Sequence, residues 1–188
     1  MAFASQLFAT LTALLAVTRS ATAADLKPWQ VTRLSTHSPS GRPGNPPFCY
    51  LRLNITDPNE FNLGKTHYGD AIIDPSSTQC NLQWDCLQDT IWGQVTPCSP
   101  TQAGLWTFEV LVPAGNSSRP SATADFDLRF TLINKMIMND DVTITQKYVG
   151  QQHFAVGKNM NGACGGSSVC NWGLIENTTV DVTQKLVE

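Results

Sequence analysis

Apolar and polar residues alternate with a period of two along most of the chain. The clearest run is ADFDLRFTLI, residues 124–133, in which every second side chain is large and apolar. This period is typical of strands with one buried and one solvated face. No segment after residue 23 has a sustained helical period, so the pattern predicts an all-β protein. Further runs with a period of two cover residues 29–34, 48–56, 105–112, 141–149 and 179–182.

Segments rich in Gly, Pro, Asn and Ser separate the expected strands. Residues 113–122 are expected to connect two strands as a hairpin, whereas residues 57–77 carry Pro, Gly and Asn and predict an irregular excursion. The chain contains no repeat of fixed period and no linker long enough to divide it. We therefore expect one domain over residues 24–188, folded as an antiparallel β-barrel or sandwich.

The first 23 residues have the features of a secretory signal peptide. Residues 4–17 form an apolar run that is shorter than the roughly 20 residues needed to span a bilayer. Ala21 and Ala23 then supply the small-x-small pattern of a cleavage site. We expect residues 1–23 to be removed and the mature protein to be secreted to the extracellular space. Because no second apolar run follows, we expect no membrane association after cleavage.

Secretion changes the expected chemistry of the cysteines. Their number is even and an oxidising compartment favours disulfides, so we expect three bonds and no catalytic thiol. Spacing alone leaves the pairing open, and the set that we favour is Cys49–Cys80, Cys86–Cys98 and Cys164–Cys170.

The glycine-rich stretch NGACGGSSVCNWG, residues 161–173, contains the last two cysteines. Five residues separate them, which exceeds the spacing of a zinc knuckle and of a thioredoxin-type redox pair. The stretch also lacks the Lys-Ser/Thr that ends a phosphate-binding loop. It is therefore interpreted as a small loop closed by a disulfide, and we expect neither a metal nor another cofactor.

Charge and glycosylation motifs narrow the class of partner. The formal net charge is −3, which argues against binding to nucleic acid or to an anionic membrane. Sequons at Asn54, Asn116 and Asn177 predict a glycoprotein if the organism that makes the protein is a eukaryote.

Two groups of residues are the best candidates for acid–base chemistry. The first is the THYGD segment, in which Asp70 could orient His67. The second is the polar face formed by Asp125, Asp127 and Arg129, because two carboxylates two residues apart on a strand resemble a glycosidase pair. Ordinary solvated positions explain both groups better, so we assign no catalytic residue. The three histidines, His37, His67 and His153, lack the spacing of metal-ligand pairs.

Aromatic and sulfur-containing residues suggest contact surfaces. Met136, Ile137 and Met138 follow one another in a segment expected to be a loop or a strand end, and they form a candidate contact patch. Trp106 alternates with polar residues and is expected in the core. Three other tryptophans lie close to cysteines and are expected to pack on disulfides, although an exposed aromatic ligand surface is the alternative. They are Trp84, Trp92 and Trp172.

The order of several motifs points to a known family. A first strand WQVTRL is followed by LRLNI, by CLQDTIWGQVTPC with a Trp between two half-cystines, by DFDLRF, and by the late pair CGGSSVC. This order resembles the Alternaria major allergen family of small secreted fungal β-barrel proteins. The resemblance spans about residues 29–182 and implies disulfides Cys86–Cys98 and Cys164–Cys170. No cysteine lies near the expected mature N-terminus, where family members form a covalent dimer.

Together, these features predict a secreted protein that acts by binding and not by catalysis. The resemblance implies a fungal effector or allergen-like protein, associated with virulence, that meets a host. Its expected partner is a host extracellular protein, such as a defence protein or a protease, or else a small apolar ligand. Residues 57–77 would then be the natural loop for protease inhibition. The alternatives are a small secreted hydrolase of cell-wall polysaccharide, with His67, Asp70 or a strand carboxylate in a cleft, and a structural wall protein.

Overall fold

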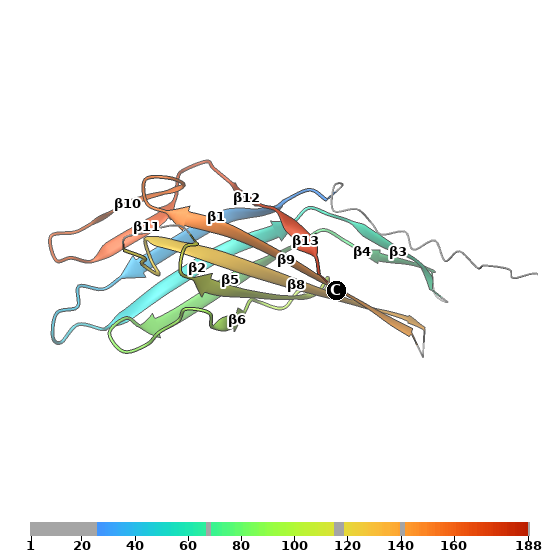
Figure 1. Cartoon of the computed structure of the whole chain (residues 1–188), viewed down its shortest axis with the longest axis horizontal. Coiled ribbons are helices and arrows are strands. Elements are labelled where there is room, and N and C mark those ends of the chain that lie inside the picture. The colour runs from blue at the N-terminus through green and yellow to red at the C-terminus, as the bar shows by residue number, and fades with distance from the viewer. Residues whose placement is uncertain (1–25, 67–68, 115–118, 140–141, 188) are drawn as a thin grey trace, which may run out of the picture.

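The described residues of the computed structural model are 26–66, 69–114, 119–139 and 142–187, and they form thirteen β-strands without a helix. Two antiparallel sheets pack face to face, and a two-stranded hairpin extends one end of the molecule (Figure 1). The predicted all-β class is therefore confirmed, and of the two predicted forms the sandwich is the one found, because the sheets of the described residues do not close into a barrel. No helix in these residues is long and apolar enough to cross a membrane.

The first sheet is built around β1 and β2, which pair along most of their length. It has the strand order β10-β11-β1-β2-β5, with β12 beside the first residues of β1. Its strands are β1 (Trp29–Ser38), β2 (Phe48–Asp57), β5 (Ser76–Asp85), β10 (Met160–Cys164), β11 (Cys170–Leu174) and β12 (Val180–Val182).

The second sheet is built around the long hairpin of β8 and β9 and has the order β13-β9-β8-β7-β6. The apolar side chains predicted from residues 124–133 face the first sheet, and Phe126 and Phe130 are fully buried. Across the two sheets, Trp29 and Trp106 meet edge to face with ring centroids 4.6 Å apart, so the core position predicted for Trp106 is confirmed. The strands are β6 (Val95–Pro97), β7 (Leu105–Leu111), β8 (Asp125–Asn139), β9 (Val142–Ala155) and β13 (Gln184–Leu186).

A β-bulge in β1 corrects a mismatch in its sequence pattern. Simple alternation from Trp29 and Val31 would bury Arg33. The pairing with β2 shifts by one residue between Val31 and Arg33, so Arg33 is exposed and Leu34 enters the core. The extra residue therefore keeps the charge in solvent and the next apolar side chain inside.

The prediction of an irregular excursion at residues 57–77 is wrong. This segment forms the hairpin of β3 (Phe61–Thr66) and β4 (Gly69–Ile73), followed by the start of β5. Ala71 and Ile73 alternate with exposed residues and are buried. Their hairpin projects from the same end of the sandwich as the far part of β8 and β9 (Figure 1). Gly64 lies at an irregularity inside β3 and Gly69 begins β4, whereas Pro58 and Pro75 lie between strands, so these residues do not indicate the absence of strands.

The structure contains three disulfides, but two of the three favoured pairs are wrong. The bonds are Cys49–Cys86, Cys80–Cys98 and Cys164–Cys170. The favoured pair of Cys49 and Cys80 fails because the register of β2 and β5 separates them by four residues, or roughly 13 Å. Cys86 follows the end of β5 and reaches the start of β2, whereas Cys98 follows β6 and joins the two sheets. The Cys86–Cys98 bond implied by the family resemblance is therefore also absent.

The last disulfide closes the glycine-rich stretch as predicted. Cys164 and Cys170 lie opposite each other at the ends of β10 and β11. Gly162 is required in β10 because a side chain there would collide with Asn171 and Trp172 of β11. Three disulfides indicate an oxidising compartment. The signal peptide expected at residues 1–23 lies outside the described residues.

Candidate functional site

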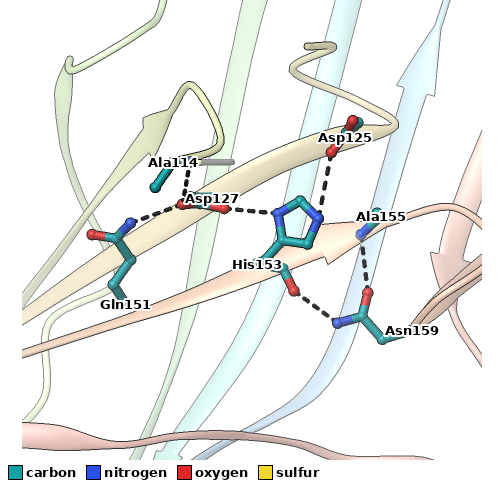
Figure 2. Close-up of polar contacts among 7 residues, drawn as sticks. All are labelled: Ala114, Asp125, Asp127, Gln151, His153, Ala155 and Asn159. Atoms are coloured by element: carbon teal, nitrogen blue, oxygen red, sulfur yellow. Dashed lines mark hydrogen bonds and ion pairs between the residues drawn. The ribbon is translucent and has the colours of Figure 1, made fainter. Parts of the chain in front are cut away.

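A polar cluster lies on the outer face of the second sheet, where β8 and β9 run side by side. Asp127 of β8 is directly opposite His153 of β9. Its Oδ1 accepts a 2.8 Å hydrogen bond from His153 Nδ1, and its Oδ2 accepts bonds from Gln151 Nε2 at 2.8 Å and from the backbone N–H of Ala114 at 3.4 Å (Figure 2). Both oxygens of this carboxylate are therefore occupied.

The imidazole of His153 lies between two carboxylates. Its Nε2 is 3.5 Å from Asp125 Oδ1, on the side opposite Asp127 (Figure 2). Asn159 fixes the strand behind it, because its side chain donates to the carbonyl of His153 at 2.8 Å and accepts from the N–H of Ala155 at 3.0 Å. The ring is thus held at both nitrogens and at its backbone.

The sequence prediction for this face is partly wrong. It expects the three charged residues of β8 to form an exposed polar row, but Asp127 is only 5% exposed. The connection after β7 covers it through Ala114, and β9 covers it through His153 and Gln151. Sequence reasoning missed His153 as a partner. DFD in β8 alternates, but QQH in β9 is polar throughout, so the contact of Asp127 with His153 becomes apparent only once the register of the hairpin is known.

Arg129, the third residue of the predicted row, is paired with Glu109 of β7. Its Nε donates to Glu109 Oε1 at 3.0 Å, and its Nη2 donates to Oε2 of the same carboxylate. Because its guanidinium donates these hydrogen bonds to Glu109, the pKa of Arg129 is raised above its usual value. The guanidinium is therefore directed at Glu109 and not at the carboxylates of Asp125 and Asp127.

The chemistry available to this cluster is limited by its hydrogen bonds. A histidine oriented by a buried aspartate is the arrangement of a general base. In the described part of the chain, however, His153 makes no hydrogen bond to a serine, threonine or cysteine that it could activate. No group of three His, Cys, Asp or Glu in the described residues has a geometry that could hold a metal ion. The contacts are those of a brace between β8, β9 and the connection after β7.

The other predicted acid–base residues do not join this cluster. His67 lies outside the described residues, and Asp70 is exposed on β4. His37 lies on the outer face of the first sheet, where its Nδ1 is 2.8 Å from Asn171 Oδ1. Its ring packs at 5.4 Å from that of Tyr50, over which Arg52 lies at 5.5 Å. This row is separate from His153 because it belongs to the other sheet.

The candidate contact patch of Met136, Ile137 and Met138 lies on β8 near the end of its pairing with β9. Ile137 is 68% exposed, whereas Met136 and Met138 are half-buried. The register of β8 with β9 shifts between Ile137 and Asn139, so simple alternation does not extend to Met138. A contact role for these three residues stays a prediction, and Ile137 is the most accessible of them.

Two of the predicted glycosylation sites can be located. Asn54 is half-buried on β2, and Asn177 is exposed in the turn after β11, where it adopts a positive φ of 58° that asparagine tolerates. Asn116 lies outside the described residues. The geometry at Asn177 makes it the more accessible of the two described positions.

A pocket of about 330 Å³ opens at the end of the sandwich opposite the β3–β4 hairpin. The connections β1–β2, β5–β6 and β7–β8 surround it, and we call it the loop-end pocket. The Cys49–Cys86 disulfide and Trp84 belong to its wall, and Trp84 is buried. Leu87 also lines it and is 68% exposed. Further lining residues are Ser38, Asp89, Ile91, Trp92 and Thr123.

The walls of the loop-end pocket are held by covalent and polar contacts. The disulfide joins the start of β2 to the β5–β6 connection. Thr123 connects the β7–β8 loop to β1, because its carbonyl accepts from Thr36 Oγ1 at 2.6 Å and its hydroxyl lies 2.7 Å from Ser38 Oγ. The sequence predicts that Trp84 and Trp92 pack on disulfides. Trp84 lies opposite Cys49 in the register of β2 and β5, and Trp92 lines the same pocket as the Cys49–Cys86 bond.

A second polar group, Asp57 and Asn59, is buried at the end of β2. Asp57, at the end of β2, accepts two hydrogen bonds from Asn59, from its N–H at 2.9 Å and from its Nδ2 at 2.6 Å. Burial raises the pKa of Asp57 despite these bonds. Burial and the charge of Asp57 also raise the pKa of Tyr148, whose ring packs 5.2 Å from Phe61.

Comparisons with known proteins return no relative. No family model matches the chain, and searches of curated proteins and of solved structures find no match. The resemblance to the Alternaria allergen family therefore stays a prediction, and of the two bonds it implies only Cys164–Cys170 is present.

Proposed function

We propose that the protein is secreted and acts by recognising an extracellular host molecule through its loop-end pocket, without catalysis. The observation that carries this proposal is the pocket itself. Its volume lies within the range of small-molecule sites, and its wall combines two tryptophans with hydroxyl groups. Because a disulfide and the bonds of Thr123 hold the wall, little ordering cost opposes binding.

A host protein fits this site better than a small apolar ligand alone. Leu87 stands exposed at the pocket, as expected for an apolar contact of a protein interface. A pocket of this size accepts one large side chain from a partner, which is how buried anchors dominate many interfaces. A defence protein or a protease is the partner class that the resemblance to fungal allergens supports, and effector or virulence roles follow from it.

The Asp127–His153 pair supports a second candidate, a hydrolase of cell-wall polysaccharide. Asp127 orients the imidazole of His153, and Asp125 lies at its other nitrogen. The occupied oxygens of Asp127 argue against its use as a nucleophile or an acid. Turnover by the wild-type protein on a polysaccharide panel, abolished in His153→Ala, would establish this candidate in place of binding.

Affinity capture from host extracellular fluid tests the proposal. The secreted protein is immobilised beside two variants, Leu87→Glu in the loop-end pocket and Val112→Glu outside it. Both replaced side chains are exposed, so neither change is expected to unfold the protein. We expect the wild type and Val112→Glu to retain the same protein, as identified by mass spectrometry, and Leu87→Glu to lose it. Equal recovery of the host protein by the immobilised wild type and both immobilised variants would reject the pocket as the binding site.

A further inference from the structure

The loop-end pocket carries a single charge. Among the described residues that line it, Asp89 alone is ionised at neutral pH, and none is Lys, Arg or His. Asp89 belongs to the β5–β6 connection, where its N–H donates to the carbonyl of Asp85 at 2.9 Å. Its Oδ2 accepts from the N–H of Asp85 at 2.8 Å, which orients the carboxylate. The pocket therefore presents a positioned negative charge and favours a cation.

The carboxylate of Asp89 retains capacity for another donor. In the described part of the chain, no group donates a hydrogen bond to its Oδ1. The hydroxyl groups of the wall are already paired with one another, because Thr123 Oγ1 lies 2.7 Å from Ser38 Oγ and 3.3 Å from Ser121 Oγ. A charged donor that enters the pocket therefore finds its strongest acceptor at Asp89.

An aromatic ring shares the pocket with this charge. Trp92 is half-buried and lines the pocket. Its backbone is fixed to β7, because it forms a β-bridge with Val110 and the N–H of Gly93 donates to the carbonyl of Val110 at 2.8 Å. The face of an indole attracts a cation, and the cation in such contacts is more often arginine than lysine.

A carboxylate and an indole in one pocket fit an arginine side chain. Its planar guanidinium can stack on an aromatic ring while its N–H groups donate to a carboxylate, which the compact ammonium of lysine cannot do in the same way. The methylene groups of arginine suit the apolar part of the wall, which includes Ile91. Arginine is also enriched among the anchors that dominate protein interfaces.

We propose that the loop-end pocket receives an arginine side chain of the host protein, with the guanidinium held by Trp92 and Asp89. This inference rests on the proposed function, because it names the anchor that the pocket takes. Leu87 then contacts the partner surface around the arginine. Leu87→Glu removes that apolar contact, whereas Asp89→Asn removes the partner of the positive charge.

An NMR titration with two small probes tests the preference for a guanidinium. The probes are Nα-acetyl-arginine methylamide and the citrulline analogue, which has nearly the same shape but no charge. We expect the arginine probe to shift the indole N–H signal of Trp92 saturably, and the citrulline probe to bind at least about fivefold more weakly. Equal affinities, or no shift with the arginine probe, would overturn the proposal.

Asp89→Asn assigns the preference to its residue. Asparagine can still accept from the N–H of Asp85, so the loop should keep its shape while the charge is lost. The variant should bind the two probes equally. Asp181→Asn is the matched control, because it removes one exposed charge beside the start of β1, whereas the pocket lies at the end of β1. An arginine preference that survives in Asp89→Asn, or that Asp181→Asn also abolishes, overturns the assignment.

The captured host protein separates this inference from the proposed function. Its affinity for Asp89→Asn should be at least about fivefold lower than for the wild type, and unchanged for Asp181→Asn. If Leu87→Glu loses the host protein but Asp89→Asn retains it fully, the pocket is the binding site and the arginine anchor is wrong. If the arginine probe binds as expected but no host protein is retained, the guanidinium site is supported and the proposed function alone is rejected.

Discussion

Asp127 and His153 face each other on β8 and β9, and the N–H at His153 Nδ1 donates a 2.8 Å hydrogen bond to Asp127 Oδ1. The carboxylate also accepts from Gln151 and from the connection after β7. One buried acceptor thus links two strands and a loop. Its loss would leave three donors without this partner, so the relationship has a measurable effect on stability.

Asp127→Ala is expected to lower the free energy of unfolding by about 2–3 kcal/mol, because hydrogen bonds to a charged group are lost together with their buried acceptor. Asp125→Ala, at the more exposed end of the same imidazole, is the matched control and should cost less than about 1 kcal/mol. Denaturant unfolding of both variants measures the difference. Equal losses would show that Asp127 has no special bracing role.

Much of the fold follows from local patterns in the sequence. The alternation in residues 124–133 predicts the buried face of β8, and the short glycine-rich loop predicts the Cys164–Cys170 bond. These features depend on neighbouring residues only. The hairpin of β3 and β4 was missed because its strands are short and its Gly and Pro residues are also typical of irregular loops.

The candidate site depends on contacts between distant residues and was harder to predict. His153 is 26 residues from Asp127, and only the register of β8 and β9 brings the two side chains together. The same holds for Cys80 and Cys98, since their bond depends on which strands pair. The loop-end pocket combines three connections whose relative positions have no signal in a single sequence.

Asp57→Asn is expected to stabilise the protein at neutral pH. Burial raises the pKa of Asp57 above 3.8, so the folded state favours the protonated carboxyl. The contribution of the Asp57 carboxyl to the free energy of unfolding is therefore fully present below pH 3.8, and it is lost as the pH rises through the pKa of the folded state. The asparagine variant should gain stability over the wild type as the pH increases from 3.8, whereas the two should converge at lower pH.

Thermal unfolding of wild type and Asp57→Asn across this pH range measures the effect. Asp181→Asn, an exposed aspartate on β12, controls for the loss of one negative charge. A gain for Asp57→Asn that is constant with pH, or equal to that of Asp181→Asn, would contradict the assignment.

Removing the Cys80–Cys98 bond with the double change to alanine should lower the free energy of unfolding by roughly 3 kcal/mol. The bond closes a loop with a sequence separation of 18 residues, and the estimate follows from the restricted unfolded chain. Removing the Cys164–Cys170 bond, whose separation is 6, should cost roughly 2 kcal/mol. Denaturant titration gives both values. The reverse order would show that effects on the native state dominate.

The Glu109–Arg129 pair should contribute little to stability. The side chain of Arg129 is 41% exposed, so solvent screens the interaction, and a double-mutant cycle is expected to give about 0.2–1 kcal/mol. The coupling should decrease as salt is added. A coupling above about 2 kcal/mol that salt does not change would contradict this view of the outer face.

The most direct test of binding at the loop-end pocket is an equilibrium titration of the captured host protein against wild type, Leu87→Glu and Val112→Glu. We expect saturable binding to the wild type, unchanged binding to Val112→Glu, and an affinity for Leu87→Glu that is at least about tenfold lower, because a charge would enter an apolar contact. Equal affinities for all three proteins, or no saturable binding to the wild type, would contradict recognition through this pocket.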